Sequence, residues 1–95
     1  QRVSYSTHTF HQYTIQTGRR DELRQFLNER GIPSMIYYPG VIHLQEGYRF
    51  LGYKKGDFPV SEKLTKRVLS LPMHTELTTE QLEFITDSVK DFFKV

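Results

Sequence analysis

The chain has 95 residues and a mass of 11.3 kDa, which suits one small domain with a single modest core. It contains no cysteine, and this excludes a disulfide framework, a thiolate metal site and a cysteine nucleophile. Thirteen lysine and arginine residues oppose eleven acidic ones, so the net charge is only +2. Acids interrupt every basic stretch, so we interpret the basic residues as solvated surface and expect no nucleic-acid partner. No apolar run predicts a membrane-spanning helix, and we expect a cytoplasmic protein that contacts no membrane.

The hydrophobic patterns predict an alternation of strands and helices. In chain order, the expected elements are a disordered start over residues 1–8, a strand over 9–17, a helix over 20–30, a strand over 34–38, a long loop over 40–58, a helix from 59, a short strand over 70–73 and a last helix from 78. Helices packed on one face of a small sheet of about three strands make an α+β fold. We therefore expect a single domain over residues 1–95.

Two of these helices have well-marked ends. In the first, Leu23 and Leu27 lie on one apolar stripe, and Gly31 follows as a residue that accepts positive φ at a helix end. The last helix begins with a capping box, in which Thr78 and Gln81 satisfy each other's free backbone N–H groups. The last helix is the most strongly predicted element.

The middle of the chain predicts a functional loop followed by a helix. The loop over 40–58 contains four glycines, and loops of this length inside small domains commonly carry function. Pro59 suits the first position of a helix. Val60, Leu64 and Val68 recur every four residues, which predicts a narrow buried seam along that helix.

The residues alone provide no complete catalytic or metal site. His8 and His11 have the spacing of metal ligands, but side chains three apart on a strand point to opposite faces. We therefore expect no metal. The carboxylates occupy positions that are ordinarily solvated on helix surfaces, and no acid–base pair can be nominated among Asp21, Glu22, Glu62, Glu76, Glu80 and Asp87.

The candidate ligand-binding residues are Tyr37, Tyr38 and His43. Adjacent tyrosines on a strand project to opposite faces, so at least one faces away from the local core. Pro39 ends the strand at once, and the following loop presents His43. Two phenols and an imidazole near a sheet edge offer stacking surfaces and hydrogen bonds to a polar ligand. Strand-end tyrosines are equally often only structural.

Read in order, the motifs resemble a known enzyme family. They run along residues 9–93 as H-Q-Y, R-D-E-L, G-I-P-S, I-Y-Y-P, H-L-Q, D-F-P-V-S-E and L-S-L-P-M-H followed by E-L-T. In this order and spacing they resemble the C-terminal small domain of the DegT/DnrJ/EryC1/StrS family. Members of that family are pyridoxal-phosphate-dependent aminotransferases that act on nucleotide-linked keto sugars, among them enzymes of cell-surface polysaccharide biosynthesis.

The resemblance implies a division of work between two domains. In the family, a large domain carries the lysine that forms the cofactor Schiff base, and no lysine of this chain matches that motif. The resemblance therefore implies that the large domain is absent from this chain, which alone binds no pyridoxal phosphate, holds no catalytic residue and is inactive. It also implies that the parent enzyme works with a second subunit.

The resemblance also assigns the candidate residues to the substrate. The family pattern is I-H-Y-P followed by H-L-Q, and these residues line the sugar-nucleotide cleft. Tyr38 and His43 match that pattern, whereas Tyr37 stands where the family more often has histidine.

Three functions remain open at this point. The first is an aminotransferase that uses glutamate as the amino donor, the second a pyridoxamine-phosphate-dependent sugar dehydratase on the same fold. The third is a freestanding nucleotide- or protein-binding module without catalysis. The residues around the expected lysine would separate the first two.

Overall fold

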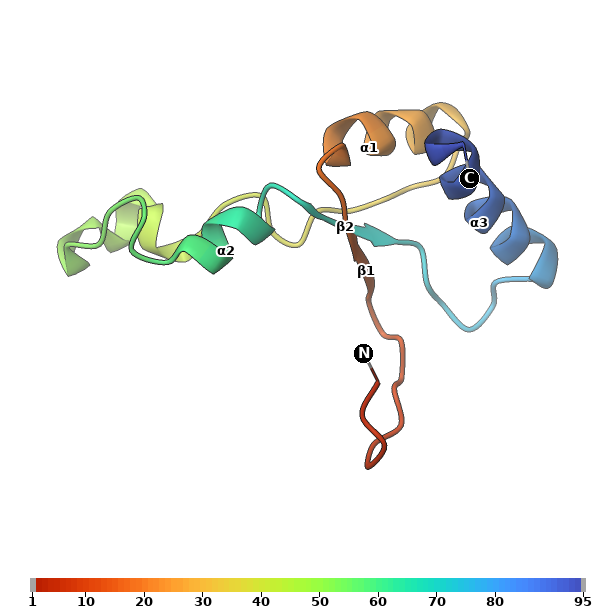
Figure 1. Cartoon of the computed structure of the whole chain (residues 1–95), viewed down its shortest axis with the longest axis horizontal. Coiled ribbons are helices and arrows are strands. Elements are labelled where there is room, and N and C mark those ends of the chain that lie inside the picture. Colours follow the sequence, from red (N-terminus) through yellow and green to blue (C-terminus); the bar gives the residue numbers. More distant parts are fainter. Residues whose placement is uncertain (1, 95) are drawn as a thin grey trace.

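The computed structural model describes residues 2–94 and divides into two parts (Figure 1). The elements in chain order are β1 (Tyr13–Gln16), α1 (Arg20–Glu29), the 3-10 helices η1 (Ile42–Leu44) and η2 (Glu46–Leu51), α2 (Pro59–Leu64), β2 (Val68–Leu71) and α3 (Thr79–Phe93). We call β1, β2, α1 and α3 the body. Residues 39–66, with η1, η2 and α2, project sideways from it and are called the arm.

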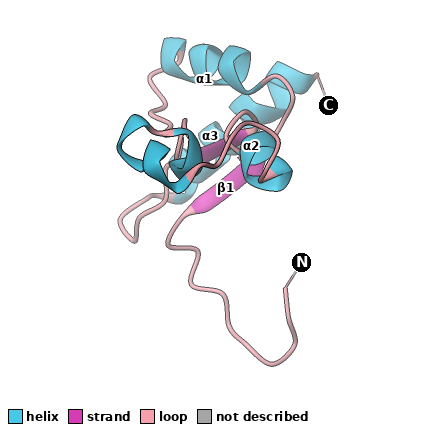
Figure 2. Cartoon of the chain, turned by 90° about the vertical axis from the view of Figure 1, so that its left-hand side faces the viewer, coloured by secondary structure: helices cyan, strands magenta, loops and turns pink. Residues whose placement is uncertain are grey.

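The sheet at the centre of the body has two antiparallel strands. Ile15 of β1 lies opposite Leu69 of β2, and Thr14 lies opposite Ser70. The hydroxyls of that second pair are 2.8 Å apart, a cross-strand hydrogen bond. In a view turned by 90°, α1 lies on one side of β1 and the N-terminal segment leads away on the other (Figure 2). The predicted α+β arrangement is confirmed.

The number of strands is smaller than the sequence predicts. The expected strand over 34–38 is reduced to a single bridge, in which Met35 and Ser70 exchange both backbone hydrogen bonds. Prolines on both sides limit the segment, because neither can donate to a ladder. The first strand is also shorter than predicted: residues 11 and 12 form a bend, after Phe10 at φ 53°.

The core is small and lies entirely in the body. Its buried apolar side chains come from α1, from the segment that follows α1 and from β2: Leu23, Leu27, Ile32 and Leu69. Partly buried side chains from the strands, from the segment after α1 and from α3 pack around them: Ile15, Ile36, Leu71, Ile85, Val89 and Phe92. The stripes predicted for α1 and α3 therefore meet the same core, and this contact places α3 against α1.

The ends of the two body helices are the predicted ones. Thr78 is the N-cap of α3, where its hydroxyl accepts from the Gln81 N–H and the Gln81 side chain accepts from the Thr78 N–H. Gly31 follows α1 at φ 73°, which suits a residue without a Cβ. Both features are local, which is why the sequence predicts them correctly.

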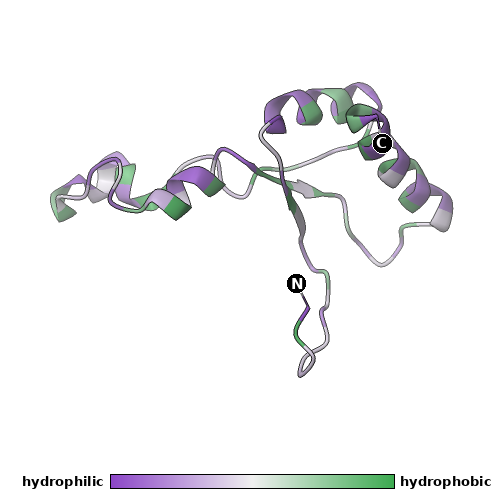
Figure 3. Ribbon diagram, viewed as in Figure 1, coloured by the Kyte–Doolittle hydropathy of each residue, from purple (hydrophilic) through white to green (hydrophobic). Residues whose placement is uncertain are grey.

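The arm has no buried residue on any of its helices. The radius of gyration of the chain is 16.2 Å, against about 12 Å for a compact domain of this length. Apolar segments lie along the outstretched part, where Phe50 is 81% exposed (Figure 3). The prediction of a buried stripe along α2 is wrong. Val60 is 71% exposed, because no element covers this face of the helix. The helix ends at Leu64, so Val68 belongs to β2.

One arginine joins the arm to the body. The Arg20 guanidinium, on a nearly buried side chain of α1, donates to the backbone carbonyls of Thr65 at 2.9 Å and Val68 at 3.3 Å. The backbone N–H of Thr17 also donates to the Arg67 carbonyl at 3.0 Å. The interpretation of Arg20 as solvated surface is therefore wrong, since its charge is used to fix the segment where the arm returns to the sheet.

Candidate functional site

Tyr37 and Tyr38 lie where the chain passes from the body into the arm. Tyr38 is 71% exposed and Tyr37 38%, and their rings meet edge to face with centroids 5.5 Å apart. A cis peptide bond joins the two residues. The sequence predicts side chains on opposite faces, as on a strand, and that prediction is wrong because this segment forms no regular strand. The pair forms one accessible aromatic surface.

His43 lies on η1, inside a cluster that closes the arm upon itself. Its side chain is 9% exposed, and its Nε2 lies 3.0 Å from Oε1 of Glu62 on α2. The imidazole also packs against the ring of Phe58, with centroids 4.8 Å apart, and Phe58 in turn meets the ring of Tyr53 at 5.0 Å. We call these four side chains the arm cluster. It links η1 to α2 through His43 and Glu62, which are 19 residues apart in the chain.

The charge at the centre of the arm cluster belongs to Glu62. The Gly56 backbone N–H donates to both of its carboxylate oxygens, at 2.8 and 3.0 Å, and this bond lowers the pKa of Glu62 more than any other contact does. The hydrogen bond from His43 and the charges of His43 and Lys55 lower the pKa further. Glu62 therefore stays ionised to lower pH than an ordinary glutamate.

Sequence reasoning missed Glu62 as a member of the site. Its position on a helix surface predicts an ordinary solvated carboxylate, whereas its side chain is only 16% exposed. A signal was available in the D-F-P-V-S-E motif, because a carboxylate in the first turns of a short helix can reach back to N–H groups of the preceding loop. Here that loop turns at Gly56, where φ is 98°.

The structure brings only two of the three candidate residues together. Within residues 2–94, no hydrogen bond or ring contact joins His43 to Tyr37 or Tyr38. In the same described range, no group of three or more histidine and acidic side chains is placed to bind a metal. The Nδ1 of His8, which the sequence singles out as half of a metal-like pair, instead accepts from the backbone N–H of Phe10 at 2.8 Å.

The arm cluster determines which nitrogen of His43 can serve a ligand. An ionised carboxylate only accepts hydrogen bonds, so the proton on Nε2 is the one shared with Glu62. Nδ1 is then the nitrogen that remains for another partner. In the neutral ring it accepts a hydrogen bond, and in the charged ring it donates one. Tyr38 adds an exposed phenol that can do either.

These features define a small α+β domain whose arm stands away from its own core. A family model described as the DegT/DnrJ/EryC1/StrS aminotransferase family matches residues 1–90. The chain therefore belongs to that family, as the motifs predict. No helix among the described residues is long and apolar enough to cross a membrane.

Individual relatives agree with the family match. The chain is 48% identical over 87 residues to a pleiotropic regulatory protein of Geobacillus stearothermophilus, covering 92% of this chain and 23% of that protein. It is 43% identical over 83 residues to a UDP-N-acetyl-3-dehydro-α-D-glucosamine 3-aminotransferase of Acidithiobacillus ferrooxidans, covering 87% and 22%. The crystal structure of Streptomyces venezuelae DesV in complex with a ketimine intermediate superposes with a TM-score of 0.82 at 36% identity, covering 86% and 22%. The chain thus spans about a fifth of the length of each of these proteins.

Proposed function

We propose that this chain is the small C-terminal domain of a cytoplasmic enzyme that transfers an amino group from glutamate to a nucleotide-linked keto sugar. The observation that supports this most strongly is the similarity to the UDP-linked sugar 3-aminotransferase over nearly the whole chain. The superposition on DesV, which was solved with a ketimine intermediate, supports the same class of chemistry. The reaction is assigned to the complete protein, because the chain spans only about a fifth of these relatives.

Pyridoxal phosphate is the cofactor we propose for the complete protein, where it would supply the electron sink for amino transfer. The residues of this chain do not fit it. An aldehyde cofactor is held by an enclosed lysine amine, whereas all six lysines lie on exposed positions: Lys54, Lys55, Lys63, Lys66, Lys90 and Lys94. We therefore derive no step through the cofactor from this chain and assign it no catalytic residue.

The work of this chain is to bind and cover the substrate. Tyr38 contributes an exposed phenol that can donate to a sugar hydroxyl or a phosphate oxygen, with Tyr37 packed against it as a support. His43 contributes Nδ1, because its Nε2 is occupied by Glu62. Each such bond to a neutral group is worth about 0.5–1.5 kcal/mol, and more when the partner is charged phosphate.

The arm supports a role at an interface within the complete enzyme. Its apolar side chains are exposed here without a covering element, including those of Ile42, Tyr48, Phe50 and Leu51. Exposed apolar surface of this kind marks sites of protein contact. We propose that the large domain and a second subunit cover it, which would exclude water from the bound sugar.

The test of this function uses the complete protein. It is incubated with pyridoxal phosphate, glutamate and a UDP-linked 3-keto sugar, and the products are identified by mass spectrometry. An aminated sugar together with 2-oxoglutarate is the expected result. Loss of water from the sugar without glutamate consumption would instead identify a dehydratase. Binding of the sugar nucleotide without turnover would identify a binding module.

Two substitutions test the assigned residues. Tyr38→Phe and His43→Ala are expected to lower kcat/KM for the keto sugar while the absorbance of the bound cofactor is unchanged. Tyr5→Phe is the matched control for the phenol, since Tyr5 is exposed at the far end of the N-terminal segment. If His43→Ala abolished cofactor absorbance and left substrate affinity intact, this residue would belong to the cofactor side and not to the substrate.

A further inference from the structure

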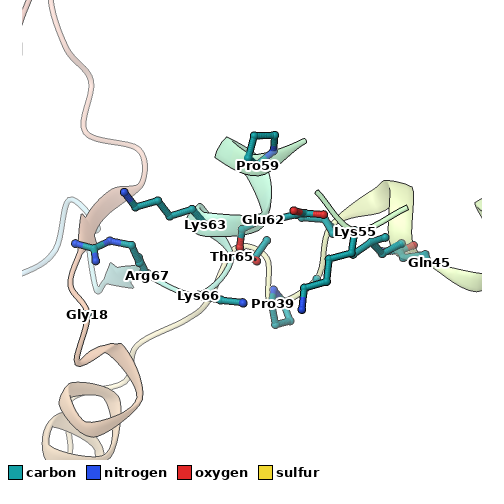
Figure 4. A pocket seen from close by; sticks show the side chains of 13 residues that line it. Gly18, Pro39, Gln45, Lys55, Pro59, Glu62, Lys63, Thr65, Lys66 and Arg67 are labelled. Carbon is teal, nitrogen blue, oxygen red and sulfur yellow. Dashed lines mark hydrogen bonds between the residues drawn. The ribbon is translucent and has the colours of Figure 1, made fainter. Parts of the chain in front are cut away.

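A cleft of about 720 Å³ lies where the arm leaves the body (Figure 4). One wall is the segment that enters the arm, from Pro39 to Gln45, and the other is α2 with the residues that follow it. Gly18 closes the end near the sheet. The volume is within the range of small-molecule sites in proteins, roughly 300–1,000 Å³. The cleft is therefore large enough for a ligand and is built from both parts of the molecule.

Four cations line this cleft from different elements. Lys55 comes from the loop before α2, Lys63 from α2 itself, and Lys66 and Arg67 from the residues after it. In the close-up, Lys55 and Lys66 reach toward the same space beside Pro39 (Figure 4). The Arg67 guanidinium lies at the other end, next to Gly18, where a Cβ on residue 18 would be 3.7 Å from its Nη1. A ligand in the cleft would therefore meet positive charge along its length.

None of these four cations lies within ion-pair distance of a carboxylate in the described part of the chain, although the charge of Lys55 acts on Glu62. Among residues 2–94, the ion pairs are formed by other side chains, and none includes Lys55, Lys63, Lys66 or Arg67. Glu62 is the one carboxylate in the lining, and its oxygens are already bonded to Gly56 and His43. The lining thus carries four cations against one occupied anion, and a concave wall of one sign attracts a multiply charged anion.

We propose that this cleft binds the phosphate groups of a nucleoside diphosphate, with Lys55 and Lys66 as the principal phosphate contacts. Lysine ammonium groups bind phosphate as point charges, without the fixed geometry that arginine requires. The position agrees with the proposed function, on which the assignment to a sugar-linked nucleotide rests. Tyr38 directly precedes Pro39 at the cleft wall, and the partner of His43 is Glu62 in the same lining. Phosphates held here would leave the sugar beside the exposed phenol of Tyr38.

The test measures binding of UDP, inorganic pyrophosphate and uridine to the complete protein by calorimetry. The variant carries Lys55→Gln and Lys66→Gln together, and Lys54→Gln is the matched control. Lys54 is adjacent in sequence and exposed, but it does not line the cleft. We expect the double variant to bind UDP and pyrophosphate about tenfold more weakly, because each lost charge-assisted bond carries a large share of the affinity. Uridine binding should not change, and Lys54→Gln should match the unaltered protein.

The outcomes separate this proposal from the proposed function. If the double variant binds UDP and pyrophosphate with unchanged affinity, the proposal that this cleft binds phosphate is wrong. If the double variant aminates the sugar with an unchanged KM, the phosphate site is also wrong, but the proposed aminotransferase function stands. Weakened pyrophosphate binding in a protein that aminates no UDP-linked keto sugar supports a phosphate site and overturns the proposed function. A higher KM for the sugar nucleotide with unaltered kcat supports both. Circular dichroism checks that the double variant is folded.

Discussion

The body and the arm of this chain are held together by different forces. The body encloses a small apolar core and marks its helices with local end signals, so that its side chains specify one arrangement. The arm buries no residue on its helices. It is held by one ionised carboxylate between an imidazole and a backbone N–H, and by the contacts of the Phe58 ring with His43 and Tyr53. The comparison shows that a single polar and aromatic cluster can order an outstretched element while its other apolar side chains remain available to another surface.

The largest expected difference between the two parts is in hydrogen exchange. Amides of α1 and α3 are protected by the core, so they are expected to exchange only through global unfolding of the chain. Amides of the arm over 39–58 are expected to exchange through local opening, at much higher rates. Exchange followed by NMR or mass spectrometry measures both. Protection throughout the arm equal to that of the helices would show that the arm is stabilised by more than the arm cluster.

Removal of a core side chain should destabilise the body strongly. Leu23 is fully buried, and Leu23→Ala is expected to lower the free energy of unfolding by about 2–5 kcal/mol. The control is Val60→Ala in the arm. It is expected to change the free energy of unfolding by less than about 0.5 kcal/mol, because Val60 is exposed. Chemical denaturation of both variants checks this. Equal losses would mean that α2 packs on the body in solution.

The joint between the two parts is expected to be the next most sensitive position. Arg20→Met removes the guanidinium bonds to the carbonyls of Thr65 and Val68, and a charged hydrogen bond contributes about 1.5–3 kcal/mol. The control is Arg24→Met on the exposed face of the same helix, with an expected change of about 0.5 kcal/mol or less. An Arg20→Met variant as stable as the control would show that these bonds are replaced by water without loss.

The cap of α3 should make a smaller contribution to the body. Thr78→Ala removes the hydroxyl that accepts from the Gln81 N–H and is expected to cost about 1 kcal/mol, within the usual range of about 0.5–2 kcal/mol. Thr75→Ala, in the exposed turn before the helix, is the control and should be near neutral. A neutral result for Thr78→Ala in thermal and chemical unfolding would contradict the capping box.

The smallest effect concerns the acid response of the arm. The pKa of Glu62 is lowered in the folded chain, first by the Gly56 N–H and then by His43, so ionised Glu62 contributes stability above the ordinary glutamate pKa of about 4.3. That contribution is lost as the pH falls through the lower folded-state value. The Gly56 amide proton shift, followed by NMR, should therefore titrate with a midpoint below the pKa of an ordinary glutamate.

Two comparisons make this titration specific. In Glu62→Gln the Gly56 shift should no longer follow the pH, because the ionisable partner is gone. The Gly52 amide, which donates to the Arg49 carbonyl, should not follow it in either protein. A Gly56 midpoint at or above the ordinary glutamate value would show that the arm cluster does not form as described. The body helices should be unaffected over this range.

The candidate site was only partly predictable from sequence. The sequence nominates Tyr38 from its place before Pro39 and His43 from the motif that surrounds it, and their contact with substrate stays a prediction. The expectation that at least one of the two tyrosines faces away from the core holds, but the strand from which it was argued does not form. The binding of His43 to Glu62 could not be foreseen, because it joins residues nineteen positions apart through a loop whose path depends on the turn at Gly56. The same holds for the cationic cleft, whose walls come from separate segments of the chain.

The sequence by itself determined the features that depend on neighbouring residues. The periodic stripe of α1, its end at Gly31 and the capping box of α3 are each encoded within a few positions, so local geometry is sufficient to specify them. Only the tertiary structure decided how much of the chain is buried. The seam of Val60 has the right spacing but no surface to pack on, whereas Arg20 and Glu62 are removed from solvent by partners far away in sequence. Burial depends on what covers a side chain, and periodicity only specifies the face on which it lies.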